Sequence, residues 1–360
     1  MWFIDRRGCC YDNLSNIYRL NMTGIEIKQR IYKAIMHSAS QFAIALVIFL
    51  VPCGCGTENS KIPEIHVIEG AWWSIAGNPD LGSYNNKDQQ NVDFTVFKAS
   101  DGTWQLWGCM RYVSNLDSLG KRLLYRWESA VITDTSWIPR WIALVPDTAI
   151  GERMVQSPFC YNEKGLYNLF YSDYNTPQIC LMTGTDGKNF TRVLNKKGKV
   201  GLWEMSQEDQ YHGRDPMIIK IGDLYYCYYC AHTDFKGAVY CRTSKTMAPG
   251  SWSRSTKVAW AGSAGNTFTS AESPFVFYHK GWYYLFRTPD QKKCFVYASR
   301  NPMEFCYYND KFLVATLDLA QPEIVEDNGH LYIASFKPGL HGYRMARLGW
   351  ERGKTVINNR

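Results

Sequence analysis

The stretch Glu272-Ser273-Pro274-Phe275-Val276-Phe277 is followed by a turn at Lys280-Gly281 and by the aromatic run Trp282-Tyr283-Tyr284-Leu285-Phe286. This order of a short apolar segment, a turn and an aromatic run occurs five times in the chain. The five copies begin at Val92-Asp93-Phe94, Gln156-Ser157-Pro158, Arg214-Asp215-Pro216, Glu272-Ser273-Pro274 and Gln321-Pro322-Glu323. Their prolines, at positions 158, 216, 274 and 322, are 58, 58 and 48 residues apart. A repeat of this length, built from short strands and hairpins, is typical of propellers and solenoids.

Composition and periodicity favour strands throughout the repeats. The chain has 360 residues, 46% of them hydrophobic and 15% aromatic, which is enough to bury a large core. Beyond residue 60, short Val, Ile, Tyr, Phe and Trp runs alternate with Gly, Asn and Asp turns, and no helical stripe of apolar residues stands out. Outer strands are expected at residues 178–183, 238–243 and 294–299. We therefore expect an all-β fold, a five-bladed β-propeller of four-stranded antiparallel blades around a central channel.

One further strand is expected to close the ring. The segment 65–76, which contains Trp72 and Trp73, precedes the first repeat, and residues 342–348 near the C-terminus are its expected partner. No Pro/Ser-rich linker or low-complexity stretch divides the repeats. The sequence therefore predicts one propeller domain over residues 62–360.

The N-terminal residues 1–56 have the pattern of an export signal. Basic residues at 28, 30 and 33 precede the ten-residue apolar run 42–51, which is too short to span a bilayer as a helix. Pro52-Cys53-Gly54-Cys55 follows and resembles a bacterial lipobox, with Cys55 the favoured lipidation site and Cys53 the second choice. A plain cleaved signal or an uncleaved anchor is the alternative. We expect a periplasmic or cell-surface bacterial lipoprotein that contacts the membrane only through its lipid.

Charge and cysteine content argue against nucleic-acid and metal binding. The net charge is +7, of which residues 1–36 contribute +3, and no basic run is interleaved with aromatic residues on one element. Cys227-Tyr228-Tyr229-Cys230 has the spacing of a metal or redox pair, but positions three apart on a strand point to opposite faces. We expect the cysteines after residue 56 to be buried free thiols, and we expect no metal site or cofactor.

Three carboxylates share nearly the same phase of the repeat. Asp93, Asp215 and Glu272 each stand at the start of an innermost strand, and so they should meet at the mouth of the channel. Carboxylates that converge repel one another, which holds at least one of them protonated near neutral pH. Glycoside hydrolysis needs this combination of a protonated acid and an ionised carboxylate. The alternative is that Asp-Pro and Ser-Pro serve only as turn residues where strands begin.

On these residues the chain resembles the five-bladed propeller glycoside hydrolases of families 43 and 32. The matching motifs are Val-Asp-Phe at Asp93, Gly-Arg-Asp-Pro at Asp215 and Ala-Glu-Ser-Pro at Glu272, and the resemblance covers about residues 70 to 350. The family 43 pattern implies that Asp93 is the general base and Glu272 the general acid. Asp215 then tunes the pKa of Glu272, and the reaction inverts configuration.

The family 32 pattern implies a retaining fructosidase with Asp93 as nucleophile. Phe94, in place of the usual proline, and the Glu-Ser-Pro motif at Glu272 favour the family 43 pattern. Many family 43 members carry Gly-His-Gly in blade five. Here Gln321-Pro322-Glu323 takes that place, which argues against a central metal ion.

Sugar-binding groups are expected around the three carboxylates. Arg214 could bind hydroxyl groups or form a structural ion pair, and His212 could contact substrate or cap its loop. The full set of candidate substrate contacts is Arg214, His212, Gln156, Trp73, Trp203 and Arg287. Either tryptophan could instead belong to the core.

The leading hypothesis is an exported glycoside hydrolase that degrades oligo- or polysaccharides. A non-catalytic carbohydrate-binding propeller at the cell surface is the second hypothesis, and a protein-interaction propeller is the third. An acid and a base would be unnecessary in either of the latter two.

Overall fold

The computed structural model describes residues 62–116, 121–173, 178–209 and 211–352. By its contacts the chain divides into Met1–Gly56 and Thr57–Arg360, and all described residues belong to the second unit. The expected signal segment, with Cys53 and Cys55, lies outside the described residues. Within the described ranges, no helix combines the length and the apolar character that crossing a membrane requires.

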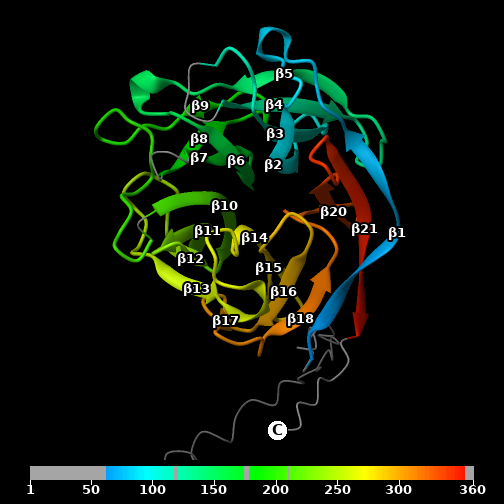
Figure 1. Cartoon of the computed structure of the whole chain (residues 1–360), viewed down its shortest axis with the longest axis vertical. Coiled ribbons are helices and arrows are strands. Elements are labelled where there is room, and N and C mark those ends of the chain that lie inside the picture. The colour runs from blue at the N-terminus through cyan, green and yellow to red at the C-terminus, as the bar shows by residue number, and fades with distance from the viewer. Residues whose placement is uncertain (1–61, 117–120, 174–177, 210, 353–360) are drawn as a thin grey trace, which may run out of the picture. The chain divides into compact units, whose positions relative to one another are not determined.

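Five antiparallel sheets form blades around a central axis (Figure 1). Blade one contains β2 (Gln90–Lys98), β3 (Trp104–Arg111), β4 (Arg122–Ser129) and β5 (Ile138–Leu144). Blade two contains β6 (Val155–Glu163), β7 (Leu166–Asp173), β8 (Gln178–Gly184) and β9 (Thr191–Arg192). Blade three contains β10 (Tyr211–Ile221), β11 (Leu224–Thr233), β12 (Lys236–Ser244) and β13 (Thr256–Trp260). Blade four contains β14 (Glu272–His279), β15 (Trp282–Thr288), β16 (Cys294–Ser299) and β18 (Leu313–Leu317). Blade five contains β19 (Glu323–Asp327), β20 (His330–Phe336), β21 (Tyr343–Arg352) and β1 (Glu64–Ala76).

This arrangement confirms the predicted five-bladed propeller. Blade three differs in one detail, because the two-residue strand β17 (Cys306–Tyr307) adds to its outer edge parallel to β13. The helical elements in the described residues are three short 3-10 turns, at Gly82–Tyr84, Thr148–Ile150 and Gly262–Ala264.

The N-terminal strand closes the ring, as the sequence predicts. β1 is the outer strand of blade five and pairs with β21 from Glu64↔Arg352 to Ala76↔Tyr343. Figure 1 shows the two strands side by side along the rim. At its start β1 also contacts blade four, where Glu64 accepts hydrogen bonds from Lys280 at 2.9 Å and contacts His279 at 2.9 Å. Chain segments almost 300 residues apart thus complete one sheet.

Each innermost strand is bent at the dipeptide that carries the repeat. The residues before the four prolines, Ser157, Asp215, Ser273 and Gln321, all have positive φ, between 49° and 57°. In blades two, three and four the strand pairing skips at this point, and in blade one it skips between Val92 and Phe94. Bulges of this kind re-aim side chains near functional sites. In blades one to three they bring Asp93, Ser157 and Asp215 together, so that the Ser157 hydroxyl contacts both carboxyl groups.

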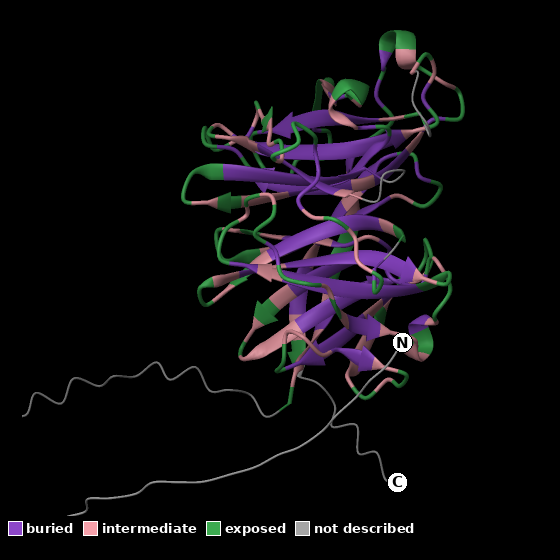
Figure 2. Ribbon diagram, turned by 90° about the vertical axis from the view of Figure 1, so that its left-hand side faces the viewer, coloured by how far each residue is buried: buried purple, intermediate pink, exposed green. Residues whose placement is uncertain are grey.

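The blades pack through aromatic side chains, and burial follows the inner strands (Figure 2). Tyr343 of β21 illustrates the contact between blades five and one: its ring lies 4.7 Å from that of Phe94, and its hydroxyl donates to the carbonyl of Val92 at 2.9 Å. All eight cysteines among the described residues are free, and seven of them are buried. The expectation of buried free thiols is therefore confirmed for seven cysteines, whereas Cys160 is half-buried.

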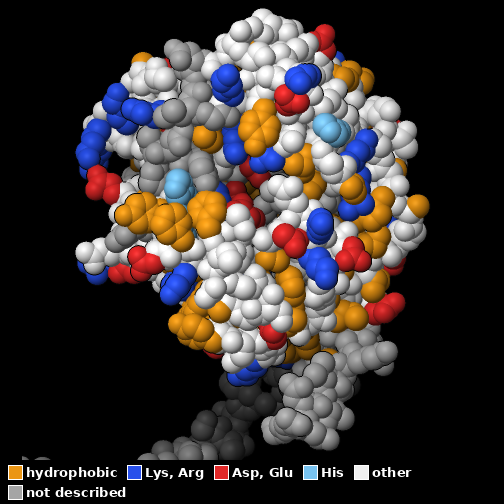
Figure 3. All heavy atoms as spheres, in the orientation of Figure 1, with side chains coloured by type: hydrophobic (Ala, Val, Ile, Leu, Met, Phe, Trp, Pro, Cys, Tyr) orange, Lys and Arg blue, Asp and Glu red, His pale blue; other side chains and the backbone are white. Residues whose placement is uncertain are grey.

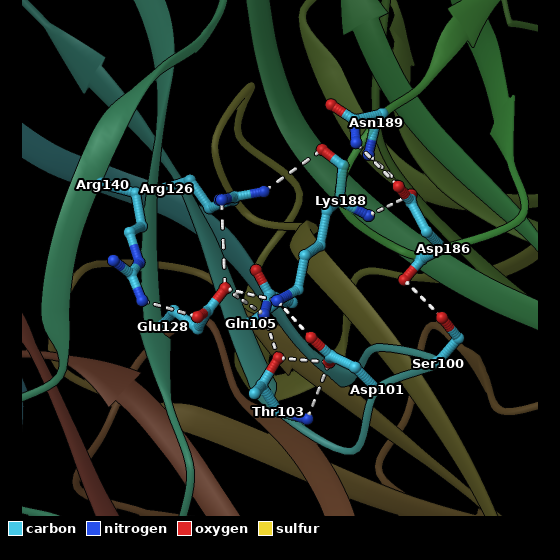
Figure 4. A network of polar contacts seen from close by, with 10 residues as sticks. All are labelled: Ser100, Asp101, Thr103, Gln105, Arg126, Glu128, Arg140, Asp186, Lys188 and Asn189. Carbon is cyan, nitrogen blue, oxygen red and sulfur yellow. Dashed lines mark hydrogen bonds and ion pairs between the residues drawn. The ribbon is translucent and has the colours of Figure 1, made fainter.

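A polar network joins blades one and two through the turn between β2 and β3 and the turn between β8 and β9 (Figure 4). The ammonium group of Lys188, from the turn before β9, contacts Asp101 at 2.5 Å and Glu128 at 2.9 Å. Glu128 also accepts hydrogen bonds from Arg140 at 2.7 Å and Gln105 at 3.0 Å. These partners outweigh the effect of burial and lower the pKa of Glu128 to about 2. The network is a structural link between blades, since none of its members lines the central pocket.

Candidate active site

A pocket of about 560 Å³ lies at the mouth of the central channel. This volume is typical of small-ligand sites. Its wall contains the carboxyl groups of Asp93, Asp215 and Glu272, together with Gln156 and Arg214. Figure 3 shows acidic side chains at the bottom of a hollow near the centre of this face, with basic side chains along one side. The structure thus brings these five residues, predicted from the repeat, into one pocket.

Asp93 is held by neutral groups from two other blades. Gln321 donates through Nε2 to Asp93 Oδ1 at 2.7 Å and accepts from the backbone N of Asp93 at 3.0 Å. The Ser157 hydroxyl lies 3.0 Å from Asp93 Oδ2. Burial and the charge of Asp215 raise the pKa of Asp93, while Arg122 and Arg111 act in the opposite direction. Asp93 is therefore a fixed carboxyl group whose proton affinity is above its usual value.

Asp215 belongs to the same hydrogen-bonded ring. Its Oδ1 lies 2.6 Å from the Ser157 hydroxyl, and its Oδ2 accepts from the backbone N of Ser273 at 2.8 Å. Thr288 of blade four accepts from the backbone N of Gln321 at 3.1 Å. The ring consequently passes through all five blades. Because a serine hydroxyl has a single hydrogen, Ser157 can donate to only one of its two carboxyl neighbours. The other contact is favourable only when that carboxyl group carries a proton.

Glu272 is paired with Arg214 across two blades. Arg214 donates through Nη2 to Oε1 at 2.5 Å and through Nε to Oε2 at 3.3 Å. Burial raises the pKa of Glu272 to about 7, and Asp215 contributes in the same direction while the guanidinium opposes it. The Glu272 side chain retains 24% of its exposure and lines the pocket. A carboxyl group that is partly protonated near neutral pH thus faces the space where a ligand would bind.

Two pocket arginines were missing from the candidates predicted from the sequence. Arg111 ends β3 and Arg122 begins β4, and they are direct partners across the two strands. Arg111 donates to Gln90 at 2.6 and 2.8 Å, and Arg122 donates to Gln156. The sequence could have predicted both arginines. In an antiparallel blade the second strand ends, and the third begins, at the mouth of the channel, where the innermost strand starts.

Three predicted substrate contacts lie outside this pocket. Trp73 of β1 packs 6.2 Å from the ring of Tyr332 in blade five. Trp203 packs against Trp252 and Tyr229 and lines a separate pocket of about 790 Å³. Arg287 is fully buried and donates to the backbone carbonyls of Ser270, Ala261 and Gly265.

His212, the remaining candidate, lies beside the pocket rather than in its wall. Its carbonyl accepts from Arg214 Nη1 at 3.0 Å. Its ring contacts His232 at 5.2 Å and Phe268 at 5.7 Å between centroids. Since Arg214 lines the pocket, His212 borders the site through the backbone of its own strand.

A smaller cavity of about 30 Å³ lies beneath the pocket. It is lined by the four repeat prolines, by Ser157 and Ser273, and by the carboxyl groups of Asp93, Asp215 and Glu323. Burial raises the pKa of Glu323 well above its usual value, which favours the neutral carboxyl group. Across the described ranges, no three His, Cys, Asp or Glu side chains are grouped so that they could hold a metal ion.

The arrangement suits proton transfer to and from a bound molecule. The pKa of Glu272 is near neutrality, and Asp93 supplies a second carboxyl group from another blade. Asp215 links the two, because it bonds to Ser157, which contacts Asp93, and to the backbone N of Ser273, which follows Glu272. Perturbed carboxyl groups gathered in a concave site are a recognised sign of acid–base chemistry.

No protein-family model and no curated protein matches the sequence. Solved structures do match. A family 117 glycoside hydrolase of the marine bacterium Zobellia galactanivorans is 13% identical with a TM-score of 0.57, covering 81% of this chain and 92% of that one. A thermostable family 43 glycoside hydrolase is 14% identical with a TM-score of 0.55, covering 75% and 92%. An exo-1,5-α-L-arabinanase from a bovine ruminal metagenomic library is 15% identical with a TM-score of 0.52, covering 76% and 96%. The chain therefore has the five-bladed propeller fold that these glycoside hydrolases share.

Proposed function

We propose that this protein is a glycoside hydrolase that cleaves glycosidic bonds in oligo- or polysaccharides. The observation that carries the proposal is the Glu272 carboxyl group, whose pKa is raised to about 7 in a pocket that also contains Asp93 and Asp215. Glycosidases need one carboxyl group protonated and another ionised at the same pH. The similarity in fold to glycoside hydrolases of families 43 and 117 supports the same activity.

In the proposed reaction, Glu272 gives its proton to the glycosidic oxygen as the bond to the anomeric carbon breaks. Asp93 accepts a proton from a water molecule while the oxygen of that water bonds to the anomeric carbon. One proton leaves Glu272 and one arrives at Asp93, so a later exchange with solvent resets the enzyme. Asp215 favours the protonated form of Glu272 through its negative charge, and its bond to the Ser273 backbone N anchors it next to Glu272.

This scheme predicts inversion at the anomeric carbon, and product stereochemistry tests it. Proton NMR of freshly released sugar distinguishes the two anomers before mutarotation. An inverted product supports Asp93 as a general base. A retained product would instead support Asp93 as a nucleophile, as in the family 32 pattern.

The decisive experiment measures sugar release by the full chain from arabinan, xylan, fructan, agar and galactan oligosaccharides. The similar arabinanase makes arabinan the first choice. Glu272→Gln keeps the shape of the side chain but cannot donate an acidic proton, and we expect it to lose roughly 10²- to 10⁴-fold in kcat. Wild-type binding without turnover on the whole panel would favour the carbohydrate-binding propeller. Unchanged activity in the variant would place the acid elsewhere.

We also propose that the protein is exported and lipid-anchored at Cys55. The support is the order of basic residues, apolar run 42–51 and cysteine in the sequence. Incorporation of labelled palmitate in a bacterial host tests this, with Cys55→Ser and Cys53→Ser as paired variants. Loss of label in the Cys55 variant alone is the expected result, and label in neither the wild type nor the variants would contradict lipidation.

A further inference from the structure

The hairpin between β11 and β12 carries an aromatic residue where its turn favours glycine. Thr233 pairs with Lys236, so Asp234 and Phe235 form a two-residue turn. Both have left-handed backbone conformations, with φ of 52° and 57°. Turns of this type favour Asn-Gly or Asp-Gly, because a bulky side chain is strained at positive φ. The Phe235 side chain is also 75% exposed, so burial of the ring offsets little of the backbone strain.

Phe235 belongs to a group of rings that leads to the pocket. We define the aromatic shelf as Tyr211, His212, His232, Phe235 and Phe268. Tyr211, His212 and Phe235 lie 5.2–5.5 Å from the ring of His232 and within 20–23° of parallel to it. Figure 3 shows a row of hydrophobic side chains beside the central hollow, on the side where β10 to β12 lie.

Four successive contacts connect Phe235 to the carboxyl group of Glu272. The Phe235 ring lies 5.4 Å from His232, which lies 4.9 Å from Phe268. The guanidinium of Arg214 lies 4.7 Å over the ring of Phe268 and bonds to Glu272. Thr269, the residue after Phe268, lines the pocket. The shelf therefore begins at the pocket wall.

The centre of the shelf is uncharged. His232 is buried, and among the described residues neither of its ring nitrogens has a hydrogen-bond partner. Burial and the nearby His212 and Arg214 lower the pKa of His232 to about 4. The exposed rings of Phe235 and Tyr211, which is 51% exposed, thus rest on a neutral aromatic base.

We propose that the aromatic shelf binds a sugar unit of the substrate chain beyond the units held in the pocket, stacking its C–H face on Phe235 and Tyr211. The inference rests on the proposed function and narrows its substrate class to chains long enough to extend from Glu272 across blade three. A pyranose or furanose ring presents C–H groups on a face, and these pack on aromatic rings while its hydroxyl groups stay in water. We propose a sugar as the ligand of the shelf because the shelf adjoins the pocket, so one oligosaccharide can occupy both.

The test compares binding of short and long oligosaccharides by the full chain. Isothermal titration calorimetry measures Kd for disaccharides and hexasaccharides of arabinan, xylan, fructan, agar and galactan. Phe235→Gly removes the ring and relieves the turn, while Phe235→Tyr keeps a ring. Tyr308→Gly is the matched control: Tyr308 is 77% exposed with φ of 63°, but its ring contacts Trp260 at the outer edge of blade three, and it does not line the pocket.

We expect the wild type to bind at least one hexasaccharide more tightly than its disaccharide. Phe235→Gly should weaken hexasaccharide binding roughly 3- to 10-fold, whereas Phe235→Tyr and Tyr308→Gly should retain it. Both glycine variants should gain about 1–3 °C in melting temperature, because each relieves a strained turn. A stability gain with an affinity loss only at Phe235 would separate the binding role from folding.

Two results would overturn the proposal: no advantage of the longer chain in the wild type, or an equal advantage in Phe235→Gly. Absence of binding to every oligosaccharide tested would also overturn it. All titrations, those of the wild-type shelf included, use the Glu272→Gln background, which prevents turnover of the ligand and keeps the binding readout separate from catalysis. If chain-length-dependent binding is found but no sugar is released, the hydrolase assignment fails and the shelf stands. If sugar is released without any dependence on Phe235, the shelf fails and the hydrolase assignment stands.

Discussion

Ser157 offers one hydroxyl hydrogen to two carboxyl groups, Asp93 and Asp215, and so contributes to setting the pKa of Asp93. The hydroxyl lies between Asp93 and Asp215, at 3.0 and 2.6 Å. Its hydrogen bond lowers the pKa of Asp93 against the larger effects of burial and Asp215. We predict that Ser157→Ala raises the pH at which activity appears on the acid side by about one pH unit. The reason is that, in the proposed mechanism, Asp93 must be ionised to act as a base.

The measurement is kcat/KM as a function of pH. Ser273→Ala serves as the control, because Ser273 contacts Asp215 through its backbone N, which the substitution leaves in place. The control should keep the wild-type acid limb. An acid limb that does not move in Ser157→Ala would show that another group governs it.

The alkaline limb of the same profile reports Glu272. Burial raises the pKa of Glu272 to about 7, and the proposed mechanism uses its protonated form, so kcat/KM should fall tenfold per pH unit above about pH 7. Aryl glycosides with a good leaving group need no proton on the departing oxygen, and for them the alkaline limb should flatten. Identical limbs for good and poor leaving groups would contradict a general-acid role for Glu272.

At the scale of the element, the innermost strands show what the sequence could and could not predict. The Pro158, Pro216 and Pro274 repeat placed Asp93, Asp215 and Glu272 at the same end of their strands, because a fixed repeat implies a fixed position in the blade. It could not predict the hydrogen-bonded ring. Ser157 and Gln321 join that ring only because the left-handed residue before each proline points to the axis.

Side-chain direction explains the predicted contacts that lie elsewhere. Arg287 and Thr288 are neighbours at the end of β15, but successive side chains on a strand point to opposite faces. Thr288 lines the pocket, whereas Arg287 binds the carbonyls of the loop before β14. Trp203 and Trp73 lie in a chain with 13 tryptophans, and composition alone does not distinguish a core ring from a binding ring.

The junction between β1 and β21 depends on Gly342. Its φ is 124°, and a Cβ there would lie 2.2 Å from the carbonyl oxygen of Ala76. We predict that Gly342→Ala destabilises the fold by about 2–4 kcal/mol, because neither backbone can move without breaking the closing sheet. The urea midpoint of unfolding measures the effect. Gly329→Ala is the control: its φ is 76°, but nothing lies within 4 Å of an added Cβ, so it should cost only about 1 kcal/mol. Equal losses in the two variants would mean that backbone strain, and not the clash, sets the cost.

At the scale of the whole propeller, the ring holds the pocket together. Asp93, Asp215 and Glu272 come from three blades, and Gln321 and Ser157 come from the other two. Their geometry therefore depends on closure of the ring by β1. Anything that opens the junction between blades four and five should loosen the pocket, even though the junction lies at the rim.

His66 makes this junction sensitive to acid. It is buried on β1, and its ring lies 4.1 Å from Trp350 of β21 and 4.8 Å from both Tyr284 and Phe286 of blade four. Burial, followed by the charge of His279, lowers the pKa of His66 to about 3. An unfolded histidine has a pKa of about 6.5, so between these values the unfolded chain binds a proton that the folded chain does not. The free energy of unfolding therefore has its full value above about pH 6.5. It falls as the pH decreases, and at pH 5 the titration of His66 has lowered it by roughly 2 kcal/mol.

We predict that His66→Phe removes this loss, because phenylalanine fills the aromatic site without a titrating group. Melting temperatures between pH 7 and pH 5 should fall less steeply in the variant than in the wild type. His341→Phe is the control, since His341 is exposed and its substitution should leave the slope unchanged. Parallel slopes for the wild type and His66→Phe would show that acid weakens the fold elsewhere. If the slopes differ as expected, activity at pH 5 should survive longer in the variant, because the same strand that buries His66 keeps the five blades, and hence the three carboxyl groups, in place.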